Sequence, residues 1–99
     1  KEETFGPITP IMSFNNIEDA IKLANDSEYG LTASVWTSDV RKGEELARRI
    51  EAGTVEVNRH GMSKAGCPWG GYKKSGIGRI YSKEGVRGFC NTKHVWIVK

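Results

Sequence analysis

The sequence contains no long hydrophobic run and no hydrophobic leader. Its apolar stretches are far too short to cross a bilayer, and it opens on Lys1, Glu2 and Glu3. We therefore expect neither a membrane-spanning segment nor a signal peptide, and no membrane partner. Because the chain also begins without a methionine, we expect its N-terminus to be a cut end.

Cysteine is scarce as well. Only Cys67 and Cys90 are present, and they lack the paired spacing of a metal site. A disulfide scaffold of this length would contain more cysteines, so a reducing, cytoplasmic setting is expected. A disulfide between the two stays open as an alternative, because the sequence does not fix their separation.

Neither sign of charge dominates. The 15 basic and 12 acidic side chains give a net charge of +3, and the two signs are interspersed. A nucleic-acid-binding protein concentrates Lys and Arg on one face with interleaved aromatics, and the nearest such cluster, residues 72–74, is too short. We expect no nucleic-acid partner, since the hypothesis of a basic nucleic-acid-binding domain rests on net charge alone.

The chain contains enough apolar residues for one globular domain at most. Its 99 residues are 37% hydrophobic, which argues against disorder. Asn15 or Asn16 is predicted to cap a first helix, and Thr37 or Ser38 a second helix that ends near Gly53. The apolar stripes of these two helices would be Ile17, Ala20, Ile21 and Ala24, and then Val40, Leu46, Ala47 and Ile50.

Extended segments separate and follow the helices. They are predicted at residues 8–14, 31–36, 54–58 and 94–98. A third, short helix is predicted at residues 82–89. Residues 59–79 contain six glycines and little periodicity, so they are predicted to form one long loop, which is typical of functional or disordered segments.

This alternation of strands and helices predicts an α/β fold built from βαβ units with a parallel sheet. Parallel sheets are normally covered on both faces. Three helices, one of them short, cannot cover both faces of four strands. We therefore expect a fragment of a larger parallel sheet with flanking helices, followed by a C-terminal strand.

Glu3 and Phe5 stand two residues apart, just before a rigid Gly-Pro turn. A carboxylate accepts two hydrogen bonds and can bind the vicinal hydroxyls of a ribose. A phenyl ring beside it can contact a flat nicotinamide. The alternative for an isolated pair is a solvated carboxylate beside a core phenylalanine.

Trp69 lies in a glycine-rich loop, where a large apolar surface suits the lining of an organic-substrate pocket. The alternative is a loop anchor packed into the core. Residues 76–78, Gly-Ile-Gly, do not join a strand directly to a helix in a G-x-G-x-x-G pattern, so they indicate tight packing rather than a nucleotide-binding loop.

Four segments stand in the order and spacing of the C-terminal part of NAD(P)-dependent aldehyde dehydrogenases. They are EETFGP at residues 2–7, ANDSEYGL at 24–31, GTVEVN at 53–58 and PWGGYKKSGIGR at 68–79. The chain resembles that family over essentially all of its length. By this resemblance, residues 1–90 would form the C-terminal part of the catalytic domain and residues 91–99 a terminal strand of the oligomerisation region.

The resemblance also implies roles for individual residues. Glu3 would bind the nicotinamide ribose of NAD or NADP, and Phe5 would contact the nicotinamide ring. The substrate-binding residues would be Gly61, Met62, Ser63 and Trp69, facing an aldehyde. The full-length protein would be a homodimer or homotetramer.

The family's reaction requires a cysteine nucleophile and a glutamate base. In the family both lie upstream of Glu3, and neither Cys67 nor Cys90 matches the nucleophile's motif. We therefore expect no catalytic residue here, no activity from this chain alone, and dependence on the remainder of the same polypeptide. The alternative is a free-standing, non-catalytic interaction module of the same fold.

Three basic residues stand on the predicted substrate loop: Arg59, His60 and Lys64. One hypothesis is that they favour an aldehyde that carries a carboxylate or phosphate. The alternative is that they are solvent-facing charges at a loop surface.

Overall fold

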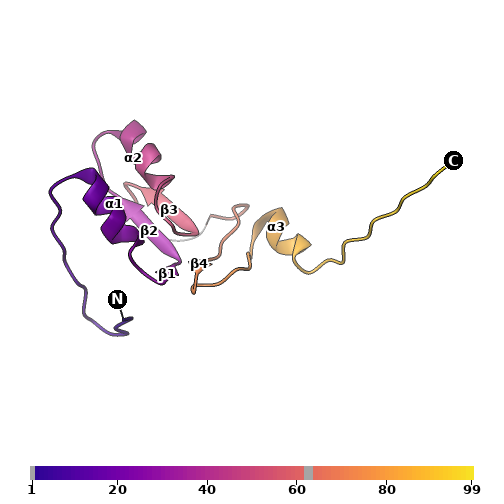
Figure 1. Cartoon of the computed structure of the whole chain (residues 1–99), viewed down its shortest axis with the longest axis horizontal. Helices are drawn as coiled ribbons and strands as arrows, with labels where there is room; N and C mark the ends of the chain where they lie inside the picture. Colours follow the sequence, from indigo (N-terminus) through magenta and orange to yellow (C-terminus); the bar gives the residue numbers. More distant parts are fainter. Residues whose placement is uncertain (1, 62–63) are drawn as a thin grey trace.

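The computed structural model describes residues 2–61 and 64–99 of the chain. Its elements are, in order, α1 (Ile17–Asn25), β1 (Tyr29–Gly30), β2 (Thr32–Val35), α2 (Val40–Ala47), β3 (Thr54–Val57), β4 (Tyr72–Lys73) and α3 (Ser82–Arg87), as Figure 1 shows. The chain is thus a mixed α/β structure, as the alternation of periodicities predicts.

The strands form two small sheets. Strands β2 and β3 are parallel, with Thr32 opposite Thr54 and Val35 opposite Val57, and α2 connects them and packs against both. Strands β1 and β4 are antiparallel. The expected sheet of four strands is therefore absent from the described residues, and residues 72–73, predicted as loop, form a strand because they pair with residues 29–30.

The C-terminal residues 91–99 belong to no helix or strand. They extend away from the rest of the chain as the yellow tail of Figure 1. No strand formed by the described residues pairs with them, so the expected terminal strand stays a prediction that depends on a partner.

The helix caps test the local predictions. The Asn16 side chain accepts a hydrogen bond from Asp19 N at 2.9 Å, as predicted for α1. The predicted cap of α2 is wrong: Asp39 caps it by accepting from Lys42 N at 3.1 Å. The Thr37 hydroxyl instead accepts from Asp39 N at 3.1 Å and positions that carboxylate.

The described residues contain almost no enclosed core. Ala52, 9% exposed, is the sole buried hydrophobic residue among them, and the chain exposes 8760 Å². A compact protein of 11.0 kDa would expose about 5600 Å². The radius of gyration is 17.5 Å, against about 13 Å for a compact domain of this length. Most apolar side chains here therefore lack the neighbours that would bury them.

None of the helices formed by the described residues is both long enough and apolar enough to cross a membrane.

Candidate functional site

The predicted cofactor residues lie on the N-terminal arm that precedes α1. Glu3 lines a hollow together with β1, the start of β2, residues 50–52 and Ser75; we call it the Glu3 hollow. Among the described residues, the Glu3 carboxylate has neither a hydrogen-bond nor an ion-pair partner. The ring of Phe5 is 98% exposed. Both side chains are therefore available to a ligand or to another surface.

Trp69 lies at a different place. It is half-buried, and its backbone pairs with Ile80 through hydrogen bonds of 2.9 and 2.8 Å. Its side chain lines a second hollow with residues 53–56, Arg59, Lys64, Cys67 and Pro68, which we call the Trp69 hollow.

The structure therefore does not bring all predicted site residues together. The Glu3 hollow and the Trp69 hollow are separate. Ala52 lines the Glu3 hollow, and the next residue, Gly53, lines the Trp69 hollow. Gly61 is exposed, and neither hollow includes it. Met62 and Ser63 lie outside the described residues.

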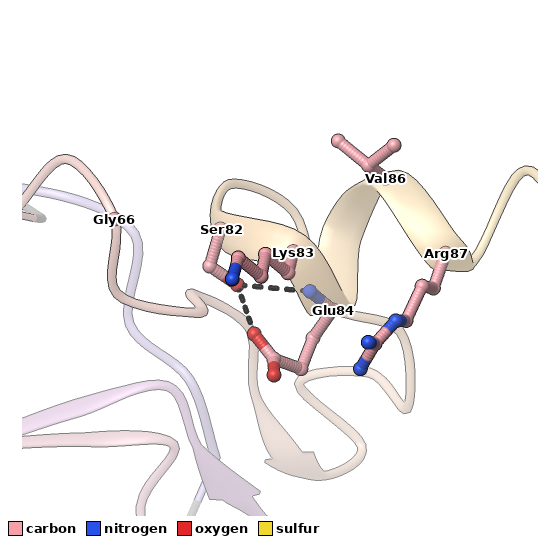
Figure 2. Close-up of a pocket in the computed structure, with 6 residues that line it drawn as sticks. All are labelled: Gly66, Ser82, Lys83, Glu84, Val86 and Arg87. Atoms are coloured by element: carbon pink, nitrogen blue, oxygen red, sulfur yellow. Dashed lines mark hydrogen bonds between the residues drawn. The ribbon is translucent and has the colours of Figure 1, made fainter.

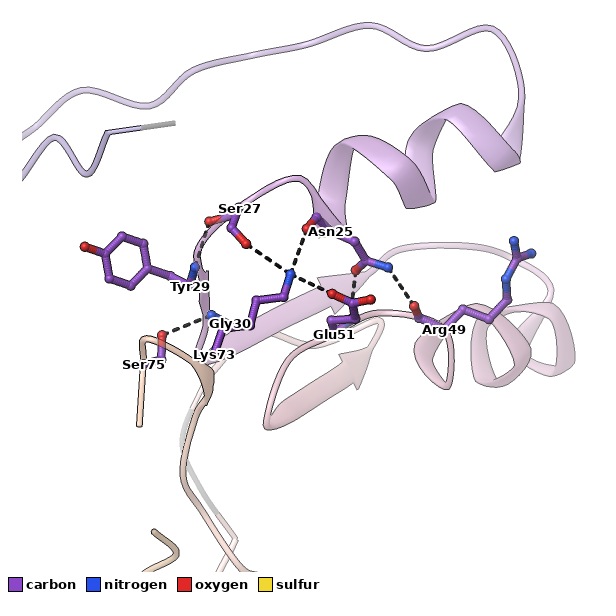
Figure 3. Close-up of polar contacts among 8 residues, drawn as sticks. All are labelled: Asn25, Ser27, Tyr29, Gly30, Arg49, Glu51, Lys73 and Ser75. Carbon is purple, nitrogen blue, oxygen red and sulfur yellow. Dashed lines mark hydrogen bonds and ion pairs between the residues drawn. The ribbon is translucent and has the colours of Figure 1, made fainter. Parts of the chain in front are cut away.

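Lys73 organises the rim of the Glu3 hollow, a role that the sequence did not reveal. Its ammonium donates to Asn25 O at 2.7 Å and Ser27 O at 3.0 Å, and pairs with the Glu51 carboxylate at 2.6 Å. Figure 3 shows these three partners converging on the single nitrogen. Because the side chain of this lysine is 26% exposed, its charge is only partly screened by solvent.

Further hydrogen bonds close the same network. Asn25 donates to Arg49 O and accepts from Glu51 N, both at 2.9 Å. Ser75 Oγ accepts from Gly30 N at 3.0 Å (Figure 3). Two of the segments quoted from the sequence, residues 24–31 and 68–79, therefore meet here as one structural junction.

Replacing Lys73 by methionine should loosen this junction by about 2 kcal/mol, because two carbonyls and a carboxylate lose a charged donor. The Gly30 and Glu51 amides should then exchange with deuterium roughly thirtyfold faster in the intact polypeptide. Lys74→Met is the matched control: Lys74 pairs with Glu28 but is 62% exposed, so its loss should cost less than about 0.5 kcal/mol. Equal exchange rates in the two variants would contradict the assigned role.

The Trp69 loop is held by Arg79. Its guanidinium donates to Gly71 O at 2.9 Å and Gly78 O at 2.8 Å, and it stacks 5.5 Å from the centroid of the Tyr72 ring. Arg79 is thus a charge that packs against the backbone of this loop. It fixes the backbone that presents Trp69.

Asn58 fixes where the loop after β3 begins. Its side chain accepts from Thr37 N at 2.8 Å and donates to Thr37 O at 2.7 Å. Its backbone has φ 55, a left-handed conformation that asparagine tolerates better than most residues. These bonds tie the end of β3 to the end of β2.

The three basic residues of this loop lie apart in the structure. Arg59 Nε lies 3.5 Å from a Glu56 carboxylate oxygen. His60 Nδ1 lies 3.2 Å from Ser34 Oγ and does not line the Trp69 hollow. Lys64 does line it.

A third hollow lies beside α3 (Figure 2), and its lining includes none of the described site residues Glu3, Phe5, Gly61 and Trp69. The Ser82 hydroxyl donates to the Glu84 carboxylate at 2.5 Å, which lowers the pKa of Glu84. Val86 points away from this pair in Figure 2. We assign this short helix no chemistry.

Metal and disulfide chemistry find no support in the part of the chain that the structure describes. No group of three potential metal ligands occurs within residues 2–61 and 64–99. Cys67 and Cys90 are both free and exposed, so the alternative of a disulfide between them is wrong.

Comparison with known proteins covers nearly the whole chain. The model of the aldehyde dehydrogenase family matches residues 1–95. Betaine aldehyde dehydrogenase of Bacillus subtilis is 44% identical over 96 residues, which are 97% of this chain and 20% of that protein. The NADP/NAD-dependent aldehyde dehydrogenase PuuC of Escherichia coli is 43% identical over 98% of this chain and 20% of its own length.

Solved structures give the same result. Betaine aldehyde dehydrogenase of Staphylococcus aureus in complex with NAD+ superimposes with a TM-score of 0.91 at 43% identity, over 96% of this chain and 19% of that one. A Mycobacterium tuberculosis aldehyde dehydrogenase complexed with NAD+ superimposes with a TM-score of 0.85 at 49% identity. The match covers 90% of this chain and 18% of that one. The chain thus spans about one fifth of the length of the relatives it matches.

Proposed function

This chain belongs to the aldehyde dehydrogenase family, and on that premise we propose that it supplies cofactor and substrate contacts to an enzyme that oxidises an aldehyde to a carboxylic acid with NAD+ or NADP+. The observation that carries the proposal is the agreement of 96% of the chain with an NAD+-bound relative at a TM-score of 0.91. Glu3 and Phe5 would contact the cofactor, and Trp69, Gly61, Met62 and Ser63 the aldehyde.

The residues present fit a nicotinamide cofactor. Glu3 has no partner among the described residues, so both carboxylate oxygens are free to accept hydrogen bonds from ribose hydroxyls. The Phe5 ring is almost fully exposed and free to contact a flat heterocycle. When bound, the cofactor would supply hydride acceptance. The chain's own residues orient it and, through Trp69, line the aldehyde's surroundings.

The reactive groups would come from elsewhere. Cys67 and Cys90 are exposed thiols. Among the described residues, no histidine, lysine or carboxylate side chain forms a hydrogen bond with either sulfur. We propose that the nucleophilic cysteine and the glutamate base belong to the remaining polypeptide, which would also provide the opposite side of the cleft. The Glu3 hollow and the Trp69 hollow would then be two parts of one site that this polypeptide completes.

Assembly and location follow from the same premise. Residues 95–98 are exposed and apolar, which supports a terminal strand that pairs with a second subunit in a homodimer or homotetramer. Two free, exposed cysteines support a reducing, cytoplasmic setting. Under this proposal residues 1–90 belong to the catalytic domain and residues 91–99 to the oligomerisation region, and β2 and β3 join a larger parallel sheet.

Glu3→Gln tests the proposed cofactor contact. The amide keeps the shape of the side chain but loses its charge, and a hydrogen bond to a charged group stabilises by about 1.5–3 kcal/mol. In the intact polypeptide we expect kcat/KM for NAD+ or NADP+ to fall about ten- to hundredfold, measured as aldehyde-dependent NADH or NADPH formation.

Glu2→Gln is the matched control, because it removes the same charge from the neighbouring position of the same exposed arm. It should leave kcat/KM within about twofold of the unaltered protein. Unchanged kinetics in Glu3→Gln, or an equal loss in both variants, would contradict the assignment of Glu3.

A further inference from the structure

The Trp69 hollow brings three charged side chains beside one aromatic. Glu56 comes from β3, while Arg59 and Lys64 come from the loop that follows it. Trp69 reaches the same hollow from a segment that pairs with Ile80. The hollow is therefore polar on the side of the loop and apolar on the side of the indole.

Its charges do not cancel. The Glu56 carboxylate, on a side chain only 20% exposed, lies 3.5 Å from the Arg59 guanidinium. Lys64 has no carboxylate partner among the described residues. One ion pair and one additional ammonium leave a net positive charge, and the additional ammonium is the group without a counter-ion.

An ammonium without a counter-ion beside an aromatic wall selects a particular kind of ligand. An anion placed against Lys64 gains a charge-assisted hydrogen bond. A cationic ligand is repelled by Lys64, and the Glu56 carboxylate that could attract it is already paired with Arg59. The carbon chain of such a ligand would lie along Trp69.

We propose that the Trp69 hollow selects aldehydes that carry a carboxylate at the end remote from the reacting group, with Lys64 as the residue that contacts this carboxylate. This inference rests on the proposed function. Arg59 is restrained by Glu56 and serves as a secondary cation, and His60, which lies against Ser34, takes no part.

The test compares two aldehydes of similar length, succinate semialdehyde and butanal, in the intact polypeptide. The quantity measured is the ratio of kcat/KM for succinate semialdehyde to kcat/KM for butanal. Lys64→Gln should lower this ratio about tenfold, because it removes the charged donor. Lys64→Arg should restore most of it. Glu56→Gln should raise the ratio, because it releases Arg59 toward the ligand.

Lys83→Gln is the control, since Lys83 lines the separate hollow beside α3. It should leave the ratio unchanged. A second readout uses unaltered protein alone: the product-like inhibitor succinate should bind about tenfold more tightly than butyrate, and this difference should shrink as salt rises.

The outcomes separate this inference from the proposed function. One outcome is that both aldehydes are oxidised while Lys64→Gln and Glu56→Gln each keep the ratio of the unaltered protein. In that case the inference is wrong and the proposed function stands. Preference for a quaternary-ammonium aldehyde over succinate semialdehyde would overturn it equally. If the unaltered protein oxidises no aldehyde with either cofactor, both fail.

Discussion

Replacing Gly53 by alanine should prevent this part of the protein from folding. A Cβ at Gly53 would lie 1.6 Å from Gly70 O, 2.7 Å from Gly70 C and 3.2 Å from Gly71 Cα. All three atoms belong to backbone, so no side chain can rotate out of the way. Gly53 N is itself held to Gly30 O at 3.0 Å, which prevents the residue from moving aside.

The expected cost is therefore above the usual range. Inserted methylenes in packed sites cost about 1–3 kcal/mol when neighbours can yield, and here they cannot, so we expect about 4 kcal/mol or more. The measurement is the soluble yield and the apparent melting temperature of the intact polypeptide carrying Gly53→Ala. We expect little or no soluble protein.

Gly78→Ala is the control for this prediction. A Cβ there meets no atom within 4 Å, and Gly78 has no positive φ. It should express and melt like the unaltered protein. Normal yield and melting of Gly53→Ala would show that the Gly53–Gly70 approach is not as close as described.

The isolated 99-residue chain should not unfold cooperatively. Its surface of 8760 Å² exceeds the value for a compact protein of this mass by about half, and Ala52 is the one buried hydrophobic residue described. Hydrophobic burial is the main term that offsets the loss of chain entropy, about 1–2 kcal/mol per residue for the backbone. With so little enclosed, the balance favours an expanded chain.

Thermal melts followed by near-ultraviolet circular dichroism measure this directly. We expect a shallow, non-sigmoidal change of the circular dichroism signal with temperature. We also expect little protection of the amides from hydrogen exchange, even in β2 and β3, and no aldehyde-dependent NADH formation. A sharp transition with protected β2 and β3 amides would show that the exposed apolar faces do not need further polypeptide.

Local features of the fold could be predicted from the sequence. Asn16 caps α1 because its own side chain and the following residues determine that bond, and residues 54–57, which are rich in β-branched side chains, form β3. The cap of α2 was missed, because Thr37, Ser38 and Asp39 all suit an N-cap and only the Thr37 hydrogen bond selects Asp39.

Long-range features could not be predicted in this way. Gly53 has the position of a glycine that ends a helix, yet α2 ends at Ala47 and the glycine is required by the approach of Gly70. Strand β4 exists because residues 72–73 pair with residues 29–30, more than forty positions earlier.

The candidate site divides in the same way. Glu3, Phe5 and Trp69 are assigned through the resemblance to a family, since neither composition nor periodicity singles them out. The role of Lys73 cannot be predicted from the sequence, because its partners include backbone carbonyls of Asn25 and Ser27, which carry no sequence signal. The distinction between Arg59 and Lys64 likewise depends on the ion pair of Arg59 with Glu56.

The most direct test of the central claim is a structure of the intact polypeptide with NAD+ bound. We predict that the Glu3 carboxylate accepts hydrogen bonds from the nicotinamide-ribose hydroxyls at about 2.5–3.0 Å, with Trp69 lining the same cleft. A cofactor bound with Glu3 and Trp69 on surfaces that face away from it would contradict the account.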